Sequence, residues 1–371
     1  MQKKGWRNLC RGGALSVALV TVLVACGGGG GDGNGSVVEP QPAPVQMSLL
    51  AGSLASKPDA MAQNHCGQVN GVGEQARFSR ITDLALSPLG DIYVSEDVYP
   101  PVSPQPPCPT PERSRIRRIA GEGVVSTFST GGDSDWGEPR NFLYPRAIAT
   151  GGSGEVFVAD GLTCAECAVF SGGMPRNGMG VWVQQASGAV RALAGSGPNS
   201  SGPRDGVGAA AIFSGPHAMR RTPDGRLFVL DWNRLRQVTA EGEVTTLPGE
   251  GFNALAVAGN GQLLVARGGE ILNYTTGQTL ARLDDNVTSM ALDSRNGIYV
   301  VTSNRSTLVQ KLSDSGQLSI VAGRVDSAPL AYELGPLPGK LLHVKAIAFD
   351  RQDRLLIAGA YAVVRTSPLV R

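Results

Sequence analysis

Short runs of Val, Ile and Leu, separated by turn residues, make up most of the chain, and little of it has helical periodicity. One pattern, apolar-x-apolar, a turn, then an apolar strand, occurs six times and aligns without an internal gap. The six copies are DLALSPLGDIYVSED from Asp83, AIATGGSGEVFVADG from Ala147, AMRRTPDGRLFVLDW from Ala218, ALAVAGNGQLLVARG from Ala254, SMALDSRNGIYVVTS from Ser289 and AIAFDRQDRLLIAGA from Ala346. Each copy predicts two antiparallel strands joined by a tight turn.

A third strand follows every copy, but a fourth strand, which typically opens after Gly, follows only five of them. The sixth unit reaches Arg371 without a fourth strand. The phrase MSLLAGS (Met47 to Ser53) matches RALAGSG and SIVAGRV, which end the second and fifth units. We therefore expect the N-terminal strand to complete the last unit and to hide sheet edges that would otherwise invite aggregation. The sequence predicts an all-β, six-bladed β-propeller over residues 46–371.

The units resemble NHL repeats, and the resemblance covers nearly the whole of residues 46–371. Two segments, NGVGEQARF (Asn70 to Phe78) and DGVGAAAIF (Asp205 to Phe213), match the DGxGxxAxF lead-in that is common in bacterial members. We expect their glycines to form the turn and their phenylalanines to lie between blades. The resemblance implies an NHL-type propeller but does not select a function, because such propellers serve as protein-binding platforms, RNA readers and, in lyase relatives, metal enzymes.

The N-terminus has the features of a bacterial lipoprotein signal. Basic residues without an acid precede the apolar run Ala14 to Ala25, which is too short to cross a bilayer as a mature helix. The segment LVAC (Leu23 to Cys26) resembles a lipobox, which implies cleavage after residue 25 and a lipid on Cys26. Residues 26–45 are rich in Gly and then Pro and predict a flexible tether. By the same resemblance, Gly27 in place of an Asp favours the outer membrane. The alternative is an ordinary secreted protein.

The charge balance argues against nucleic acid as a partner. Residues 1–25 contain four of the 33 Lys and Arg and none of the 31 Asp and Glu, so 29 basic residues face 31 acidic ones in the mature chain. A nucleic-acid-binding protein needs a strongly basic face. We expect no binding of nucleic acid and no cofactor.

The long insertions are expected on one face of the propeller, where the loops enter the innermost strands and join the second strands to the third. They are HCGQVNGVGEQARFSRIT, VYPPVSPQPPCPTPERS, LTCAECAVFSGGMPRNGM and AGSGPNSSGPRDGVG, all in the first three units. Such one-sided elaboration is typical of a binding surface on a rigid scaffold. The alternative is tolerated surface insertion.

One position of the repeat alignment is expected to surround the mouth of the central channel. It lies close before the first-strand core and holds six residues, which we call the ring residues: Thr82, Arg146, His217, Asn253, Thr288 and Lys345. Two cations and a histidine without an acid among them favour an anionic or carbonyl-rich ligand, or an acidic loop of a partner. The alternative is a water-filled channel lined by polar groups.

The chain offers little for a metal site or a catalytic site. Its three histidines are His65, His217 and His343, and the first and third lie away from the ring positions. Amidating-lyase relatives hold a metal with several histidines, and calcium-dependent lactonase relatives need a set of Glu and Asn or Asp, of which the ring supplies Asn253 alone. We therefore predict no metal and no catalytic residue. The acids at second-strand ends, Asp97, Asp160 and Asp231, are expected to pin neighbouring loops.

Six cysteines are present, of which Cys10 is lost with the signal and Cys26 takes the lipid. The other four, Cys66, Cys108, Cys164 and Cys167, fall in the insertions, and an even number in an oxidising compartment predicts disulfides. Pairs 66–108 and 164–167 are one arrangement, and the sequence does not fix the pairing. A Cys₄ zinc cluster or a redox CxxC is the alternative.

The sequence thus predicts a lipid-anchored NHL-type propeller of the cell envelope that binds a protein or a polymer through its loop-rich face. The alternatives are an envelope enzyme of lyase or lactonase type and a sensor for a small anion, both using the central channel.

Overall fold

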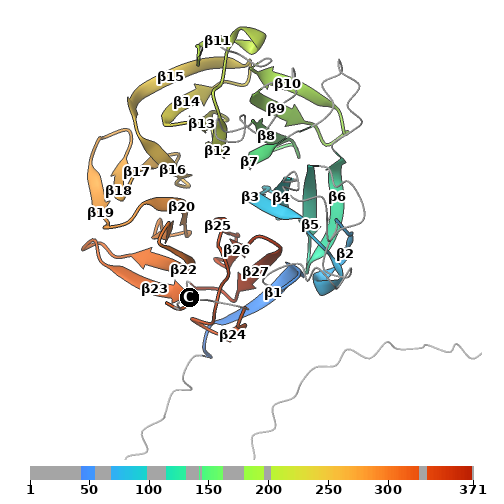
Figure 1. The fold of residues 1–371 in the computed structure, drawn as a ribbon, viewed down its shortest axis with the longest axis vertical. Coiled ribbons are helices and arrows are strands. Elements are labelled where there is room, and N and C mark those ends of the chain that lie inside the picture. The colour runs from blue at the N-terminus through green and yellow to red at the C-terminus, as the bar shows by residue number, and fades with distance from the viewer. Residues whose placement is uncertain are drawn as a thin grey trace, which may run out of the picture. The chain divides into compact units, whose positions relative to one another are not determined.

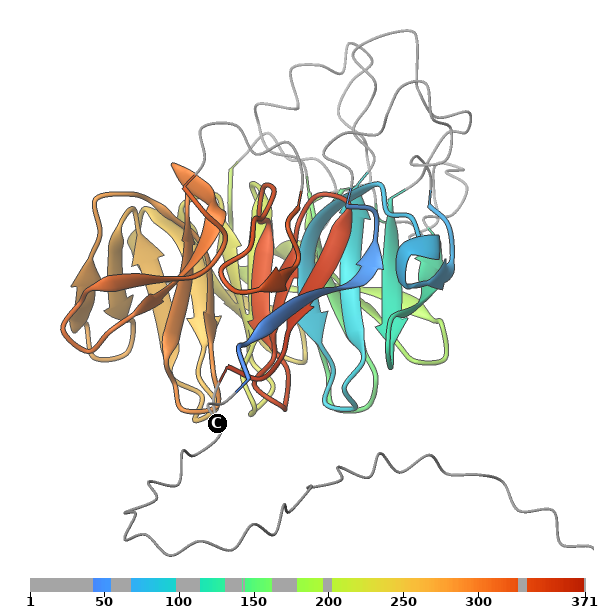
Figure 2. The same cartoon turned by 90° about the horizontal axis from the view of Figure 1, so that it is seen from below.

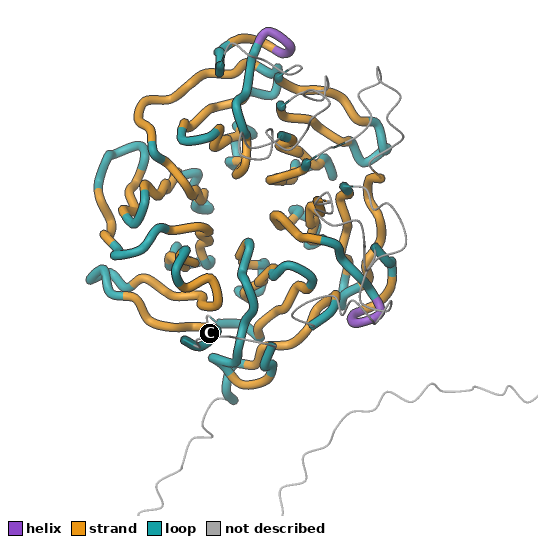
Figure 3. Tube along the Cα trace, viewed as in Figure 1, coloured by secondary structure: helices purple, strands orange, loops and turns teal. Residues whose placement is uncertain are grey.

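Six antiparallel sheets are arranged radially about a central axis in the computed structural model of the chain (Figure 1). The structure describes residues 43–54, 68–97, 114–130, 142, 144–161, 179–195, 202–325 and 332–369. Apart from two single turns of 3₁₀ helix at the periphery, η1 (Gly73–Gln75) and η2 (Gly208–Ala210), these residues form strands and loops (Figure 3). The predicted all-β, six-bladed propeller is confirmed.

Each blade has four main strands, numbered here from the axis outward. Blade 1 contains β3 (Arg80–Leu86), β4 (Ile92–Asp97), β5 (Arg115–Ala120) and β6 (Val124–Thr130), and blade 2 contains β7 (Pro145–Thr150), β8 (Val156–Asp160), β9 (Gly180–Gln184) and β10 (Val190–Ala194). Blade 3 contains β12 (Pro216–Arg221), β13 (Leu227–Asp231), β14 (Arg234–Val238) and β15 (Glu243–Glu250). Blade 4 contains β16 (Phe252–Val257), β17 (Leu263–Arg267), β18 (Glu270–Asn273) and β19 (Thr279–Arg282). Blade 5 contains β20 (Val287–Leu292), β21 (Ile298–Thr302), β22 (Arg305–Leu312) and β23 (Leu318–Ala322), and blade 6 contains β25 (Ala346–Phe349), β26 (Leu355–Ala358), β27 (Ala362–Thr366) and β1 (Gln46–Gly52).

The N-terminal strand closes the ring as the repeat count predicts. β1 pairs antiparallel with β27, with Met47 opposite Thr366 and Leu49 opposite Val364. Figure 2 shows β1, in blue, running beside the red strands of blade 6. The last blade is therefore built from both ends of the propeller sequence, and each end holds the other in place.

The repeated phrase AGS marks a close approach that only glycine permits. Gly52 is the last residue of β1 and Gly195 follows β10, and their φ angles are 103° and 91°. A Cβ on Gly195 would lie 2.6 Å from the Met179 carbonyl oxygen, and a Cβ on Gly52 would lie 2.8 Å from the ring of Phe78. Left-handed backbone and lack of space therefore both require glycine here.

The hydrophobic core consists of six clusters, one between each pair of neighbouring blades. Between blades 6 and 1, for example, Leu50 and Val363 pack with Ile81 and Val94. Each sheet thus buries both faces against its neighbours, and the packing is continuous around the ring.

Three short strands, not predicted from the sequence, add a fifth, outer member to blades 1, 3 and 6. β2 (Gly71–Val72) pairs with β6, β11 (Gly206–Val207) pairs with β15, and β24 (Gly335–Pro336) pairs with β1. β2 and β11 belong to residues 68–78 and 204–213, which contain the two NHL-like motifs and which we call the lead-in segments. Phe78 and Phe213 at their ends are buried in the clusters of blades 6 and 1 and of blades 2 and 3, as expected.

A buried arginine on the third strand binds each lead-in segment. In blade 3, Arg236 donates hydrogen bonds to the carbonyl oxygens of Arg204 and Ile212, at 2.9 and 3.1 Å, and to the carboxylates of Asp205 and Asp231, at 2.9 and 2.8 Å. Its guanidinium also lies over the Phe213 ring, 5.1 Å from the centroid.

The corresponding arginine of blade 1 binds the first lead-in segment in the same way. Arg117 donates to the carbonyl oxygens of Val69 and Arg77, to the side chain of Asn70 and to the carboxylate of Glu96. Neither arginine side chain has any exposed surface. Each lead-in segment is therefore held in place because its own backbone carbonyls accept hydrogen bonds from a buried arginine.

Replacing Arg236 with Met should destabilise the protein by about 3–5 kcal/mol, because Asp231 would stay buried without its cation. The matched control is Arg234→Met on the same strand, where the side chain is exposed and a change within about 0.5 kcal/mol is expected. Equilibrium unfolding in urea measures both values. Equal losses in the two variants would contradict the role assigned to Arg236.

Candidate functional site

The six ring residues occupy equivalent positions at the start of the innermost strands. In five blades the pairing of the first and second strands skips one residue, and the skipped residues are Thr82, Arg146, His217, Asn253 and Thr288. Lys345 directly precedes β25, and its backbone N–H donates to the Ala358 carbonyl at 2.8 Å. A bulged residue is released from the ladder, and its side chain is re-aimed. The structure thus gathers the ring residues at one end of the innermost strands, as predicted; their function stays a prediction.

The uncharged ring residues hydrogen-bond to nearby backbone. Thr82 donates to the Pro145 carbonyl of blade 2 at 2.6 Å, and the Asn253 amide donates to the Val287 carbonyl of blade 5. Thr288 donates to Val301 within its own blade at 3.2 Å. Thr82 and Asn253 therefore join neighbouring blades.

Two of the ring residues, Arg146 and Lys345, lie near a buried carboxylate. Asp97, at the end of β4, has no exposed side-chain surface, and it pairs with Arg80 of the same blade and with Arg146 of blade 2 at 3.6 Å. Lys345 of blade 6 lies close enough to feel the charges of both Arg80 and Asp97. We call Arg80, Arg146, His217 and Lys345 the cationic cluster.

The pKa values of two cluster residues are lowered by burial and, to a smaller extent, by a neighbouring cation. Burial lowers the pKa of His217, and the positive charge of Arg146 lowers it further, whereas the Gly215 carbonyl and Asp231 oppose the shift. Desolvation and the charge of Arg80 likewise lower the pKa of Lys345, while Asp97 raises it. Both shifts disfavour the charged forms, and a bound anion would oppose them because a nearby negative charge stabilises a protonated His or Lys.

Arg80 and Asp97 are functional candidates that the sequence analysis missed or assigned otherwise. Asp160 and Asp231 do pin loops, since they accept hydrogen bonds from the backbone N–H groups of Tyr144 and Ser214 at 2.5 and 2.7 Å. Asp97 instead forms ion pairs, so the surroundings of the ring contain an acid after all. Arg80 stands two residues before the ring residue Thr82, and this position in the repeat was the signal from which it could have been identified.

A second ion pair connects three innermost strands. Arg220 of blade 3 donates to Asp83 of blade 1 at 3.2 Å, and the Ile148 backbone N–H of blade 2 donates to the same carboxylate at 3.2 Å. Burial raises the pKa of Asp83, although Arg220 opposes the shift. This pair joins blades 1, 2 and 3 close to the axis.

The long insertions attach at the same end of the blades as the ring residues. Residues 98–113 follow Asp97, which lies opposite Arg80 at the start of β3. Residues 162–178 likewise follow β8, whose last residue Asp160 lies opposite Pro145 at the start of β7. The insertions are therefore connected at the predicted end.

Several predicted site residues lie outside the described residues: Cys26, Cys66, Cys108, Cys164, Cys167 and His65. Lipidation and disulfide formation accordingly stay predictions. His343 is exposed, two residues before Lys345. Within the described ranges, no group of three or more His, Cys, Asp or Glu is arranged to hold a metal ion. None of the described helices is long and apolar enough to cross a membrane.

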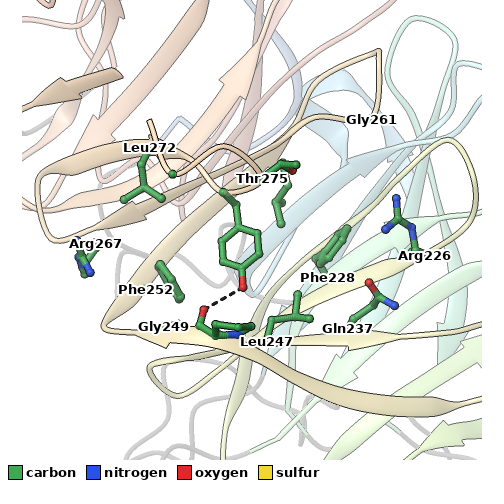
Figure 4. A pocket seen from close by; sticks show the side chains of 14 residues that line it. Arg226, Phe228, Gln237, Leu247, Gly249, Phe252, Gly261, Arg267, Leu272 and Thr275 are labelled. Atoms are coloured by element: carbon green, nitrogen blue, oxygen red, sulfur yellow. Dashed lines mark hydrogen bonds between the residues drawn. The ribbon is translucent and has the colours of Figure 1, made fainter. Parts of the chain in front are cut away.

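Two grooves flank blade 4, and no ring residue lines either of them. The groove between blades 3 and 4 has a volume of about 690 Å³ and is lined by apolar side chains such as Phe228, Phe252 and Leu272. Figure 4 shows Arg226 and Arg267 at its two ends. The groove between blades 4 and 5 has a volume of about 570 Å³ and a mostly polar lining. Neither groove was predicted from the sequence.

The fold is shared with solved structures of bacterial proteins. A protein of unknown function from Bacteroides thetaiotaomicron is 16% identical, with a TM-score of 0.58 over 87% of this chain and 76% of that chain. An auxiliary nutrient binding protein from the same organism is 11% identical, with a TM-score of 0.57 and the same coverage. A gluconolactonase from Xanthomonas campestris is 14% identical, with a TM-score of 0.51 over 78% of this chain and 86% of that chain.

No protein-family model matches the sequence, and no match was found among curated proteins. At the identities of the solved structures, the likeness concerns the fold alone. It agrees with the architecture described above: the chain is a six-bladed β-propeller.

The pKa of His217 should lie below the usual value of about 6.5, and it should rise in an Arg146→Gln variant because a nearby positive charge is removed. NMR titration of the imidazole C–H signals measures it, with the signal identified by its loss in a His217→Gln variant. As control, Arg226→Gln removes an exposed cation elsewhere in blade 3 and should leave the pKa unchanged. An unaltered pKa in Arg146→Gln would show that the two side chains do not interact.

Proposed function

We propose that this protein is a lipid-anchored binding protein of the cell envelope, and that its cationic cluster takes an anionic group of a protein or polymer partner. The observation that carries the proposal is the convergence of Arg80, Arg146 and Lys345, from three blades, around the carboxylate of Asp97, with His217 of a fourth blade close to Arg146. Arg80, Arg146 and Lys345 together face the one carboxylate of Asp97, which leaves an excess of positive charge beside it. A carboxylate, sulfate or phosphate group would offset that excess.

The local electrostatics support an anion over a cation or a neutral ligand. Arg146 is largely buried, with 16% of its side chain exposed, and the Asp97 carboxylate is fully buried. Buried or partly buried charges are poorly screened by salt, so their field acts on a nearby ligand more strongly than that of surface lysines. A bound anion would also raise the pKa values of His217 and Lys345 toward their ordinary range.

The platform role combines this cluster with the insertions that attach beside it. Loops on a rigid scaffold are the usual carriers of binding function, and the three most elaborated blades are those that supply Arg80, Arg146 and His217. The likeness to an auxiliary nutrient binding protein concerns the fold, so the proposal rests on the cluster. The lyase or lactonase alternative stays a prediction that no observation in the described residues favours.

The anchor forms the second part of the proposal and rests on the lipobox-like segment ending at Cys26. In a Gram-negative host, the wild-type protein should be found in the membrane fraction with a lipid on Cys26 as its first residue. A Cys26→Ala variant should lose the lipid, as intact-mass spectrometry would detect. An unmodified wild-type protein that begins at another residue would rule out the anchor.

Titration calorimetry with a hexaglutamate peptide and with inorganic phosphate tests the anion site. An Arg146→Gln/Lys345→Gln double variant should bind either anion at least about tenfold more weakly, because charge-assisted hydrogen bonds are lost. The affinity for hexaglutamate should rise as the pH falls from about 6.5 to about 5.5, since the pKa of His217 is lowered and its protonation adds a charge while the glutamates stay ionised.

The matched control is Arg295→Gln/Arg351→Gln, which removes two exposed cations from turns between first and second strands, at the opposite end of the blades. It should bind as the wild type does. Equal weakening of binding in both double variants would show that the effect depends only on net charge and would contradict the proposed site. Binding of phosphate without hexaglutamate would favour a small-anion sensor over a platform.

A further inference from the structure

On blade 5, the groove between blades 4 and 5 lies at the position that a lead-in segment occupies on blades 1 and 3. Residues 68–78 pack on the side of blade 1 that faces blade 6, and residues 204–213 pack on the side of blade 3 that faces blade 2. Blade 5 is entered instead through a link of four residues, 283–286, between β19 and β20. Beside this link, the side of blade 5 that faces blade 4 borders the groove of about 570 Å³.

Blades 1 and 3 bind their lead-in segments through three shared features. The first is the buried acid and arginine pair, Glu96 with Arg117 and Asp231 with Arg236. The second is the glycine in the turn between the third and fourth strands: the carbonyls of Gly123 and Gly242 accept hydrogen bonds from the N–H groups of Gly73 and Gly208, at 3.0 and 2.9 Å. The third is the start of the outer strand, Val124–Val125 and Glu243–Val244, which pairs with β2 and β11.

Blade 5 has a residue at each of these positions, and all of them line the groove. Val94, Val229 and Val300 are equivalent on the second strands, and they lie opposite Arg117, Arg236 and Gln310. In the same register, Thr302 corresponds to Glu96 and Asp231. Gly316 corresponds to the turn glycines, and Gln317 and Leu318 correspond to the residues that pair with the lead-in strand.

Two of these groove residues are buried polar side chains. Gln310 is 5% exposed and makes no side-chain hydrogen bond within the described part of the chain. Thr302 is 2% exposed, and its hydroxyl lies beside the Asp285 carboxylate. Buried polar groups normally have partners, so the unpaired amide of Gln310 points to a polar occupant.

The lining also indicates what kind of occupant fits. The arginines of blades 1 and 3 only donate, whereas a glutamine amide and a threonine hydroxyl each donate and accept, which matches the C=O and N–H groups of a peptide backbone. The charges that line the groove are balanced, with Arg282 and Arg305 against Asp284 and Asp285. A neutral segment therefore fits better than a charged one.

We propose that this groove binds an extended, glycine-containing peptide segment of a second protein, which adds to β23 as a fifth strand. β23 is the outermost strand of blade 5 in the described residues, as β6 and β15 would be without β2 and β11. Strand addition of this kind draws its affinity from main-chain hydrogen bonds. The groove between blades 3 and 4 lacks the polar pair, because Arg267 and Leu272 stand at the equivalent positions.

Fluorescence anisotropy with a labelled synthetic peptide, and hydrogen exchange with the unlabelled one, test the proposal on the full-length protein. The probe has the sequence of residues 68–78, QVNGVGEQARF, with blocked termini. It should bind, and hydrogen exchange should slow in residues 313–322, which contain the start of β23. A peptide with the Gly73→Val change should bind much more weakly, because Gly73 has a φ of 56°, which a β-branched residue resists.

Replacing Gln310 with Leu should weaken peptide binding about tenfold or more, because hydrogen bonds to the peptide are lost and its polar groups are left unpaired. The matched control Gln237→Leu alters a third-strand glutamine of blade 3 that lines the other groove, and it should leave binding unchanged. If the Gln310→Leu variant fails to fold, the hydrogen-exchange measurement on the wild-type protein still tests the proposal. Absence of binding at the highest soluble peptide concentration, or protection only outside residues 313–322, would overturn the proposal.

Discussion

The pairing of β1 with β27 is the interaction on which the other features of the structure depend. It turns a row of sheets into a closed ring, so that every blade is buried on both faces by its neighbours. The ring residues lie at one end of the innermost strands only because all six blades are held in the same orientation. The cationic cluster combines side chains from blades 6, 1, 2 and 3, and it would not assemble in an open chain of blades.

Within this closed ring, two kinds of site arise from small departures from the repeat. At the start of the innermost strands, a bulge frees one side chain per blade, and the residue type decides whether it binds a neighbouring carbonyl, as Asn253 does, or contributes charge, as Arg146 does. On the lateral faces, the length of the segment before each blade decides whether the space between blades is occupied by the chain's own residues. The short link before blade 5 leaves its buried polar pair without such a segment.

The fold was predictable from sequence because it repeats: six copies of one strand pattern define the blades, and one surplus strand at the N-terminus matches one missing strand at the C-terminus. The ring residues were predictable for the same reason. Arg80 and the role of Asp97 were not, because their ion pairs form across blades and within a bulged strand, where spacing along the chain says little. The partners of Arg117 and Arg236 were also missed, since a buried arginine in a strand has no distinctive sequence pattern. The grooves form where no described segment of the chain fills the space between two blades, and no single sequence motif indicates such a space.

The proposed anion site is formed by charged side chains from four blades, at the end of the ring where the insertions attach. A crystal grown with selenate, a tetrahedral dianion, with diffraction measured at the selenium absorption edge, tests it most directly. We expect an anomalous peak at the cluster, with the selenate oxygens within hydrogen-bonding distance of Arg80, Arg146 or Lys345. Anomalous peaks confined to exposed arginines elsewhere, with none at the cluster, would contradict it.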